Sequence, residues 1–230
     1  MKKVWHQRNE LNRHAAVHQW LASLPAGASL LDAGAGVQRY RGLATHLAYT
    51  SQDFGDYKGG ELFGDKQSPS WDASRCDLLC DITALPVADG HFDHVLCTEV
   101  FEHLPEPQLA LRELARVIKP GGSMLLTAPF RALYHQDPYF FYSGFSRYWY
   151  EYHAAACGLD IAGIEPNGSY FRDIAQELDR ILKMGGPLQR LVAAPLLLPL
   201  IFYLFLLERW FRPKTPESCW GYHVLLIKQA

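Results

Sequence analysis

Short apolar runs alternate with amphipathic stretches along the first two thirds of the chain. Apolar residues recur at helical spacing up to Pro25 and Gly27, which predicts a helix over 5–24. Runs of strand length predict strands at 29–32, 48–54, 77–81, 92–97, 123–128, 160–164 and 221–228. Further helical patterns lie at 107–119, 148–156 and 171–178. This alternation indicates βαβ units, and therefore an α/β fold with a mainly parallel sheet.

Three of the predicted strands have an acid at their last or second-to-last residue, and glycines follow the first of these acids. Asp32 precedes Gly34 and Gly36, which let the backbone approach a ligand closely and turn tightly. A carboxylate at this strand end can hold a cationic ammonium group. Asp53 lies about 20 residues beyond the turn, where an acid can accept hydrogen bonds from ribose hydroxyls.

The third acid completes a pattern for one ligand. Asp81 can accept a hydrogen bond from the amine of an adenine, while Ile82 packs on the ring. The carboxyl ends of parallel strands meet at one edge of the sheet, so the three sites together describe an adenosine with an amino-acid tail. A single Gly-x-Gly turn is also common as a purely structural turn, and it is the ordered triplet that favours the ligand.

With these motifs the chain resembles the class I S-adenosylmethionine (SAM)-dependent methyltransferases, specifically the type 11 group. The resemblance covers roughly 30–130 and the last strand, and includes the runs 92–97, 99–104 and 114–122. It implies a Rossmann-like, seven-stranded, mostly parallel sheet with helices on both faces, whose final strand lies antiparallel beside the fifth. It implies SAM as the cofactor, bound at Asp32, Gly34, Gly36, Asp53, Asp81 and Ile82, with Thr98 and Glu99 near the donor.

One departure and two rival functions accompany this resemblance. Many members have a third glycine where this chain has Gln38. A nicotinamide- or flavin-dependent oxidoreductase would have glycine at the position of Arg39, and Asp32 would repel its pyrophosphate. A SAM- or nucleotide-binding module without catalysis would keep the same acids, so only turnover separates it from an enzyme.

The segment after the fifth strand is expected to face the acceptor. We expect methyl transfer to an oxygen, with nitrogen or carbon as the alternatives. For an oxygen a general base helps, and we select His135 first, Asp137 second and His103 third. The alternative for His135 is an ordinary loop histidine, and for His103 a residue that stabilises the loop or borders the SAM pocket. The many aromatic residues between 134 and 152 are expected to form mostly core, with a few lining a pocket. Similar chains often act in cell-surface pathways, which suggests a small-molecule, glycan or lipid-linked acceptor.

Charge and cysteine content indicate which partners, metals and cellular locations to expect. The net charge is -2 and no basic run occurs, which argues against a nucleic-acid partner. The five cysteines lack zinc-site spacing, so we expect no metal and free thiols in a reducing compartment. The first residues are polar rather than apolar, which does not match a signal peptide and favours a cytoplasmic location.

An uncharged apolar segment, 191–207, precedes the last strand and contains Pro195 and Pro199. A single membrane crossing here would separate the last strand from its sheet. The segment therefore fits a buried or homodimer-forming hairpin, or a helix at the inner face of a membrane, better than a spanning helix. We expect one domain over 1–230, with an N-terminal helix in 1–27, a substrate-side cap at 130–150 and an apolar insertion at 186–212.

Overall fold

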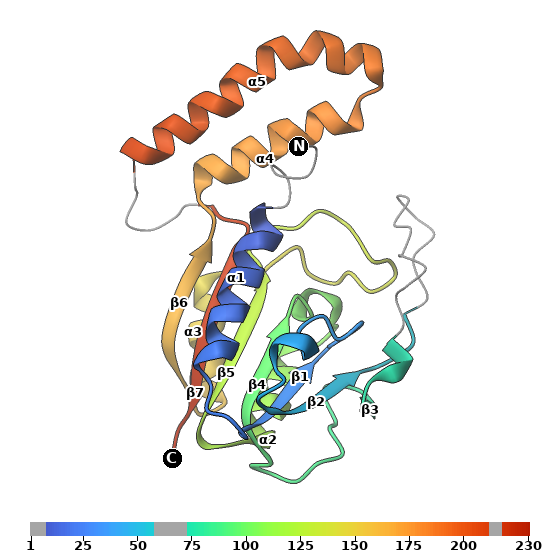
Figure 1. Ribbon diagram of the computed structural model, residues 1–230, viewed down its shortest axis with the longest axis vertical. Helices are drawn as coiled ribbons and strands as arrows, with labels where there is room; N and C mark the ends of the chain where they lie inside the picture. Colours follow the sequence, from blue (N-terminus) through green and yellow to red (C-terminus); the bar gives the residue numbers. More distant parts are fainter. Residues whose placement is uncertain (1–7, 58–72, 212–217) are drawn as a thin grey trace.

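A seven-stranded sheet forms the centre of the computed structural model, which describes residues 8–57, 73–211 and 218–230 (Figure 1). The strand order is β3-β2-β1-β4-β5-β7-β6. Strand β7 runs antiparallel to both β5 and β6, and the other pairs are parallel. The strands are β1 (Ser29–Ala33), β2 (Ala48–Asp53), β3 (Leu78–Leu79), β4 (Phe92–Thr98), β5 (Ile118–Pro129), β6 (Leu159–Asn167) and β7 (Gly221–Lys228). The expected fold class is confirmed.

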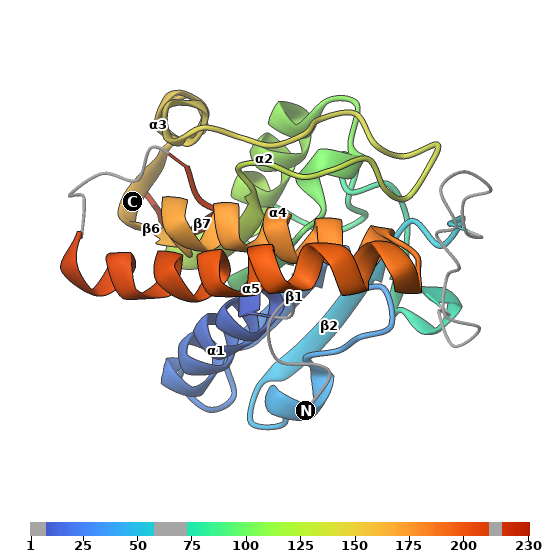
Figure 2. The same cartoon turned by 90° about the horizontal axis from the view of Figure 1, so that it is seen from above.

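Helices cover both faces of this sheet. Helix α1 (Arg8–Ser23) packs on one face, and α2 (Pro107–Val117) and α3 (Arg147–Ala156) pack on the other (Figures 1 and 2). Helix α1 buries Val17 and Leu21 against the sheet, as its apolar spacing predicts. The helix predicted over 107–119 stops at Val117, because Ile118 is buried beside Phe92 and already begins β5.

Two further helices stand above the carboxyl ends of the parallel strands (Figure 1). Helix α4 (Tyr170–Met184) and helix α5 (Pro187–Trp210) form a helical hairpin between β6 and β7. The apolar segment is thus one continuous helix, although it contains Pro195 and Pro199. Of its side chains only Ile201 is buried, so the expectation of a segment buried within the chain is wrong. By length and composition alone, α5 is the one described helix that could cross a membrane.

Candidate functional site

A cavity of about 480 Å³ opens at the carboxyl ends of β1, β2 and β4. This is the edge at which ligands bind in sheets of this kind. Seven of the eight residues expected at the cofactor line it, and they are Asp32, Gly34, Asp53, Asp81, Ile82, Thr98 and Glu99. The eighth, Gly36, lies beside it and donates its backbone N–H to Asp53 Oδ2 at 3.0 Å. The structure therefore brings the three predicted acids to one cavity.

Asp32 is the most deeply placed of these acids. Its side chain is buried and accepts a hydrogen bond of 2.5 Å from the Tyr49 hydroxyl. Burial raises the pKa of Asp32 to about 7, although the Tyr49 hydrogen bond opposes the shift. The carboxyl thus changes charge near neutral pH, and a cation at this point would favour the ionised form.

The turn after β1 requires glycine at one position. Gly34 has a φ of +70°, and a Cβ atom there would lie 2.3 Å from Val100 Cγ2. Its N–H donates to Gln52 Oε1 at 3.1 Å, which holds the turn against β2. Gln38, at the position where related turns have glycine, also adopts a positive φ of 56°. The departure noted in the sequence therefore keeps the left-handed backbone, at a cost of about 1 kcal/mol.

The other two acids already hold backbone groups. Asp53 accepts hydrogen bonds from the N–H groups of Gly36 and Gly55, and Asp81 Oδ1 accepts from both the N–H and the hydroxyl of Thr83. These bonds hold the two carboxylates in place, and both residues line the cavity. Aromatic rings lie at the same edge, since Phe54 meets Tyr139 edge to face with ring centres 5.2 Å apart.

Helix α1 contributes three polar side chains that the sequence reasoning did not select. Glu10, Arg13 and His14 line the cavity from the helix. Arg13 forms an ion pair of 2.9 Å with Glu99, whose other oxygen accepts from Thr127. In the sequence, these three residues stand out only by lying on the polar face of a predicted helix. Ordinary solvent-exposed residues lie on such a face too, so the sequence gives no reason to select them.

Strained backbone also gathers here. Among the described residues, three other than glycine have a positive φ: Gln38, Glu99 and Gln136. Glu99 and Gln136 line the cavity, and Gln38 lies between two residues that do. Such strain costs of order 1–3 kcal/mol and persists where the surroundings impose it, which is typical of ligand sites.

The acceptor side differs from the sequence expectation. His135 and Asp137 are absent from the cavity lining, whereas His103, Gln136, Tyr139 and Phe141 belong to it. Asp137 is buried in the loop, and His135 Nδ1 bonds to the Leu133 carbonyl oxygen at 2.8 Å. The third-choice histidine is thus the one that reaches the cavity.

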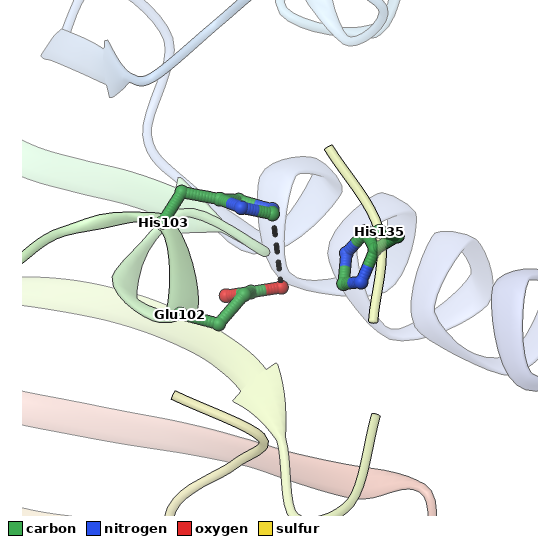
Figure 3. A group of neighbouring side chains, drawn as sticks. All are labelled: Glu102, His103 and His135. Atoms are coloured by element: carbon green, nitrogen blue, oxygen red, sulfur yellow. Dashed lines mark ion pairs between the residues drawn. The ribbon is translucent and has the colours of Figure 1, made fainter. Parts of the chain in front are cut away.

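His103 belongs to a compact trio with Glu102 and His135, drawn in Figure 3. His103 Nδ1 lies 2.5 Å from the Tyr139 carbonyl oxygen, and its Nε2 lies 3.7 Å from Glu102 Oε1. Glu102 is 1% exposed, its Oε2 has no hydrogen-bond partner, and burial raises its pKa. The ligand atoms of the trio lie within 4.8 Å of one another, so these side chains could hold a divalent cation or share a proton. The expectation of no metal stays a prediction.

Comparison with known proteins points to one family. Residues 31–126 match the family model described as a methyltransferase domain. A similar curated protein is the 2-methyl-6-phytyl-1,4-hydroquinone methyltransferase of Synechocystis sp., 32% identical over a region that covers 48% of this chain and 36% of that protein. The chain therefore spans well under two thirds of the length of this relative.

Solved structures agree on the fold. Phosphoethanolamine N-methyltransferase 2 of Haemonchus contortus, in complex with S-adenosyl-L-methionine, superposes with a TM-score of 0.56 at 16% identity, covering 95% of this chain and 53% of that one. Magnesium protoporphyrin IX methyltransferase from Synechocystis with bound SAM gives a TM-score of 0.52 at 15% identity, covering 100% and 86%. At these identities the likeness shows the fold alone.

Proposed function

We propose that the chain, whose residues 31–126 match the methyltransferase-domain model, is a class I SAM-dependent methyltransferase that transfers a methyl group from SAM to an oxygen of its acceptor. The observation that carries the proposal is the convergence of Asp32, Asp53 and Asp81 on one cavity. SAM carries a cationic sulfonium and ammonium group and no phosphate, so an acid-lined cavity suits it and disfavours a dinucleotide.

The residues present fit SAM at each of its parts. Asp32 would hold the ammonium group, and Arg13 of α1, which also pairs with Glu99, would hold the carboxylate. Asp53 would accept from the ribose hydroxyls, and Asp81 and Ile82 would hold the adenine. Gly34 and Gly36 would let the backbone approach the bound SAM closely. Thr98 and Glu99 would lie near the methyl donor. When bound, SAM supplies an already activated methyl group, so much of the catalysis is positioning.

We assign the general base to His103 rather than to His135. The Nδ1–H of His103 donates to the Tyr139 carbonyl, which leaves Nε2 as the basic nitrogen that takes the proton of an acceptor hydroxyl. Glu102 Oε1 lies 3.7 Å from that nitrogen, and a positive charge on the imidazole would oppose the raised pKa of Glu102 and favour an ionised Glu102 that stabilises the imidazolium. His135 packs on the ring of His103, with ring centres 4.9 Å apart, and is therefore a positioning residue.

The acceptor is proposed to be a small-molecule, glycan or lipid-linked hydroxyl compound. Phe54, Tyr139 and Phe141 offer aromatic surface to such a group at the cavity mouth. The relative named above acts, by its name, on a hydroquinone with a phytyl chain, which is an oxygen-bearing and apolar compound.

Binding and turnover test the proposal separately. Calorimetry should show one SAM bound per chain, and binding of NADH without SAM would overturn the cofactor assignment. A screen of hydroxyl acceptors with methyl-labelled SAM should then give transfer. SAM binding without transfer to any acceptor would favour the non-catalytic module.

A further inference from the structure

Helix α5 presents an unusually apolar surface to solvent. Val192 and Leu196 are 73% and 74% exposed, and Phe202 is 61% exposed. Taken at 100° per residue, the exposed positions between Arg190 and Glu208 cover about 200° of the helix circumference, twice the stripe that usually faces a protein core. Between Arg190 and Glu208 this surface carries no charged side chain.

The outer direction of this surface is fixed by contacts on the opposite side of the helix. Ile201 is buried in the seam toward α4, and Glu208 pairs with Arg172 at 2.8 Å. Arg8 of α1 lies over the Phe205 ring at 5.1 Å. Because these contacts lie on the side of α5 that faces the rest of the domain, the apolar surface on the other side faces away from the sheet. Figures 1 and 2 show α5 at the edge of the molecule, beyond α4.

Positive charge lies at one end of the apolar surface. Arg209, near the end of α5, is exposed and, taken at 100° per residue, lies within this arc. Within the described part of the chain it has no acidic ion-pair partner, whereas Glu208 is paired with Arg172. Trp210, 84% exposed, lies within the same arc. Arg190 lies on the opposite side of the helix, in line with Glu208, and donates to the Lys183 carbonyl oxygen at 2.7 Å. Arginine and tryptophan beside an apolar band match the anionic headgroup region of a bilayer.

We propose that α5 binds flat to an anionic lipid bilayer. A second copy of the chain would cover one stripe of the helix, whereas a bilayer surface can accommodate the whole arc together with Arg209 and Trp210. A spanning helix conflicts with the topology, since β7 follows α5 and lies between β5 and β6 of the same sheet.

This docking orients the catalytic edge. Strands β1, β4, β5 and β6 all end on the side of the molecule that carries α4 and α5 (Figure 1). A bilayer bound to α5 therefore lies on the same side of the molecule as the carboxyl ends of the strands, where the cofactor cavity opens. Resting on the proposed function, we infer that the acceptor has an apolar chain and reaches the cavity from the bilayer.

Vesicle sedimentation of the full chain tests the docking. Wild-type protein should pellet with phosphatidylcholine vesicles that contain about 30% phosphatidylglycerol, and the double variant Val192→Glu/Leu196→Glu should lose about tenfold or more in partitioning. The control Tyr152→Glu, at an equally exposed aromatic on α3, should bind like wild type. Arg209→Gln should lose about fivefold on the anionic vesicles and little on phosphatidylcholine alone.

Three results would overturn the proposal. The first is that wild-type protein binds to neither vesicle. The second is that Val192→Glu/Leu196→Glu dissociates a dimer in light scattering without changing vesicle binding, which assigns the surface to a second copy. Resistance to extraction by alkaline carbonate would instead show a spanning helix. SAM titration of the same variants separates the two proposals, because loss of docking should leave the affinity for SAM unchanged.

Discussion

Asp32 links the affinity for SAM to pH. Burial holds its pKa at about 7 in the cavity without ligand, whereas an ordinary aspartate has 3.8. An ammonium group beside the carboxylate favours the ionised form, so binding should lower this pKa and release a proton. The perturbation that isolates the effect is Asp32→Asn, which keeps an oxygen for the Tyr49 hydroxyl and cannot ionise.

The size of the pH effect on SAM binding follows from the pKa of Asp32. If only the ionised carboxyl binds, then with a pKa of about 7 the dissociation constant should rise about tenfold between pH 8 and pH 6. Asp32→Asn should weaken binding about ten- to a hundredfold through the lost charge-assisted hydrogen bond, and should remove most of this pH dependence. The raised pKa also means that ionised Asp32 costs the ligand-free fold up to about 4 kcal/mol above pH 7, a cost that disappears as pH falls toward 4.

Calorimetry measures both consequences. Titration of SAM at pH 6, 7 and 8, in buffers of different ionisation enthalpy, gives the dissociation constant and the number of protons released. Thermal unfolding of ligand-free Asp32→Asn should show a midpoint above that of wild type at pH 8. A wild-type affinity independent of pH, with no proton release, would refute the assignment of Asp32 to the ammonium group.

Further predictions concern the turn, the base and the metal. Gly34→Ala should abolish SAM binding in calorimetry and lower the melting temperature, because its Cβ would meet Val100 at 2.3 Å and its φ is +70°; an unchanged affinity would contradict the close approach. His103→Gln should lower kcat about a hundredfold or more with SAM affinity unchanged, whereas His135→Gln should cost less than tenfold, and the reverse order would restore His135 as the base. Treatment with EDTA should leave the labelled methyl transfer unchanged, and a loss that Zn²⁺ or Mn²⁺ restores would make Glu102, His103 and His135 a metal site.

The strand ends were predictable because local rules determine them. A buried apolar run followed by an acid and glycine at Asp32 and Gly34 specifies a strand and a tight turn, and parallel pairing then places the acids at one edge. The antiparallel place of β7 followed from the family resemblance, since nothing local in an apolar run specifies its partner.

Other features depend on contacts between distant segments. Arg13 reaches Glu99 only because α1 packs across the sheet, and the sequence shows it as one polar helix position among several. His135 and His103 are 32 residues apart along the chain, and the loop path, not the residue type, decides that His103 reaches the cavity. The exposure of α5 could not be predicted either, because the same apolar composition suits a helix in the core and a helix on the surface.

A crystal structure of the chain with S-adenosylhomocysteine, the product of methyl transfer from SAM, tests the central claim most directly. We expect the ligand in the cavity at the carboxyl ends of β1, β2 and β4, with its ribose hydroxyls on Asp53 and its ammonium group at Asp32. If the ligand binds elsewhere, or if the cavity stays empty at saturating concentration, this cavity is not the SAM site.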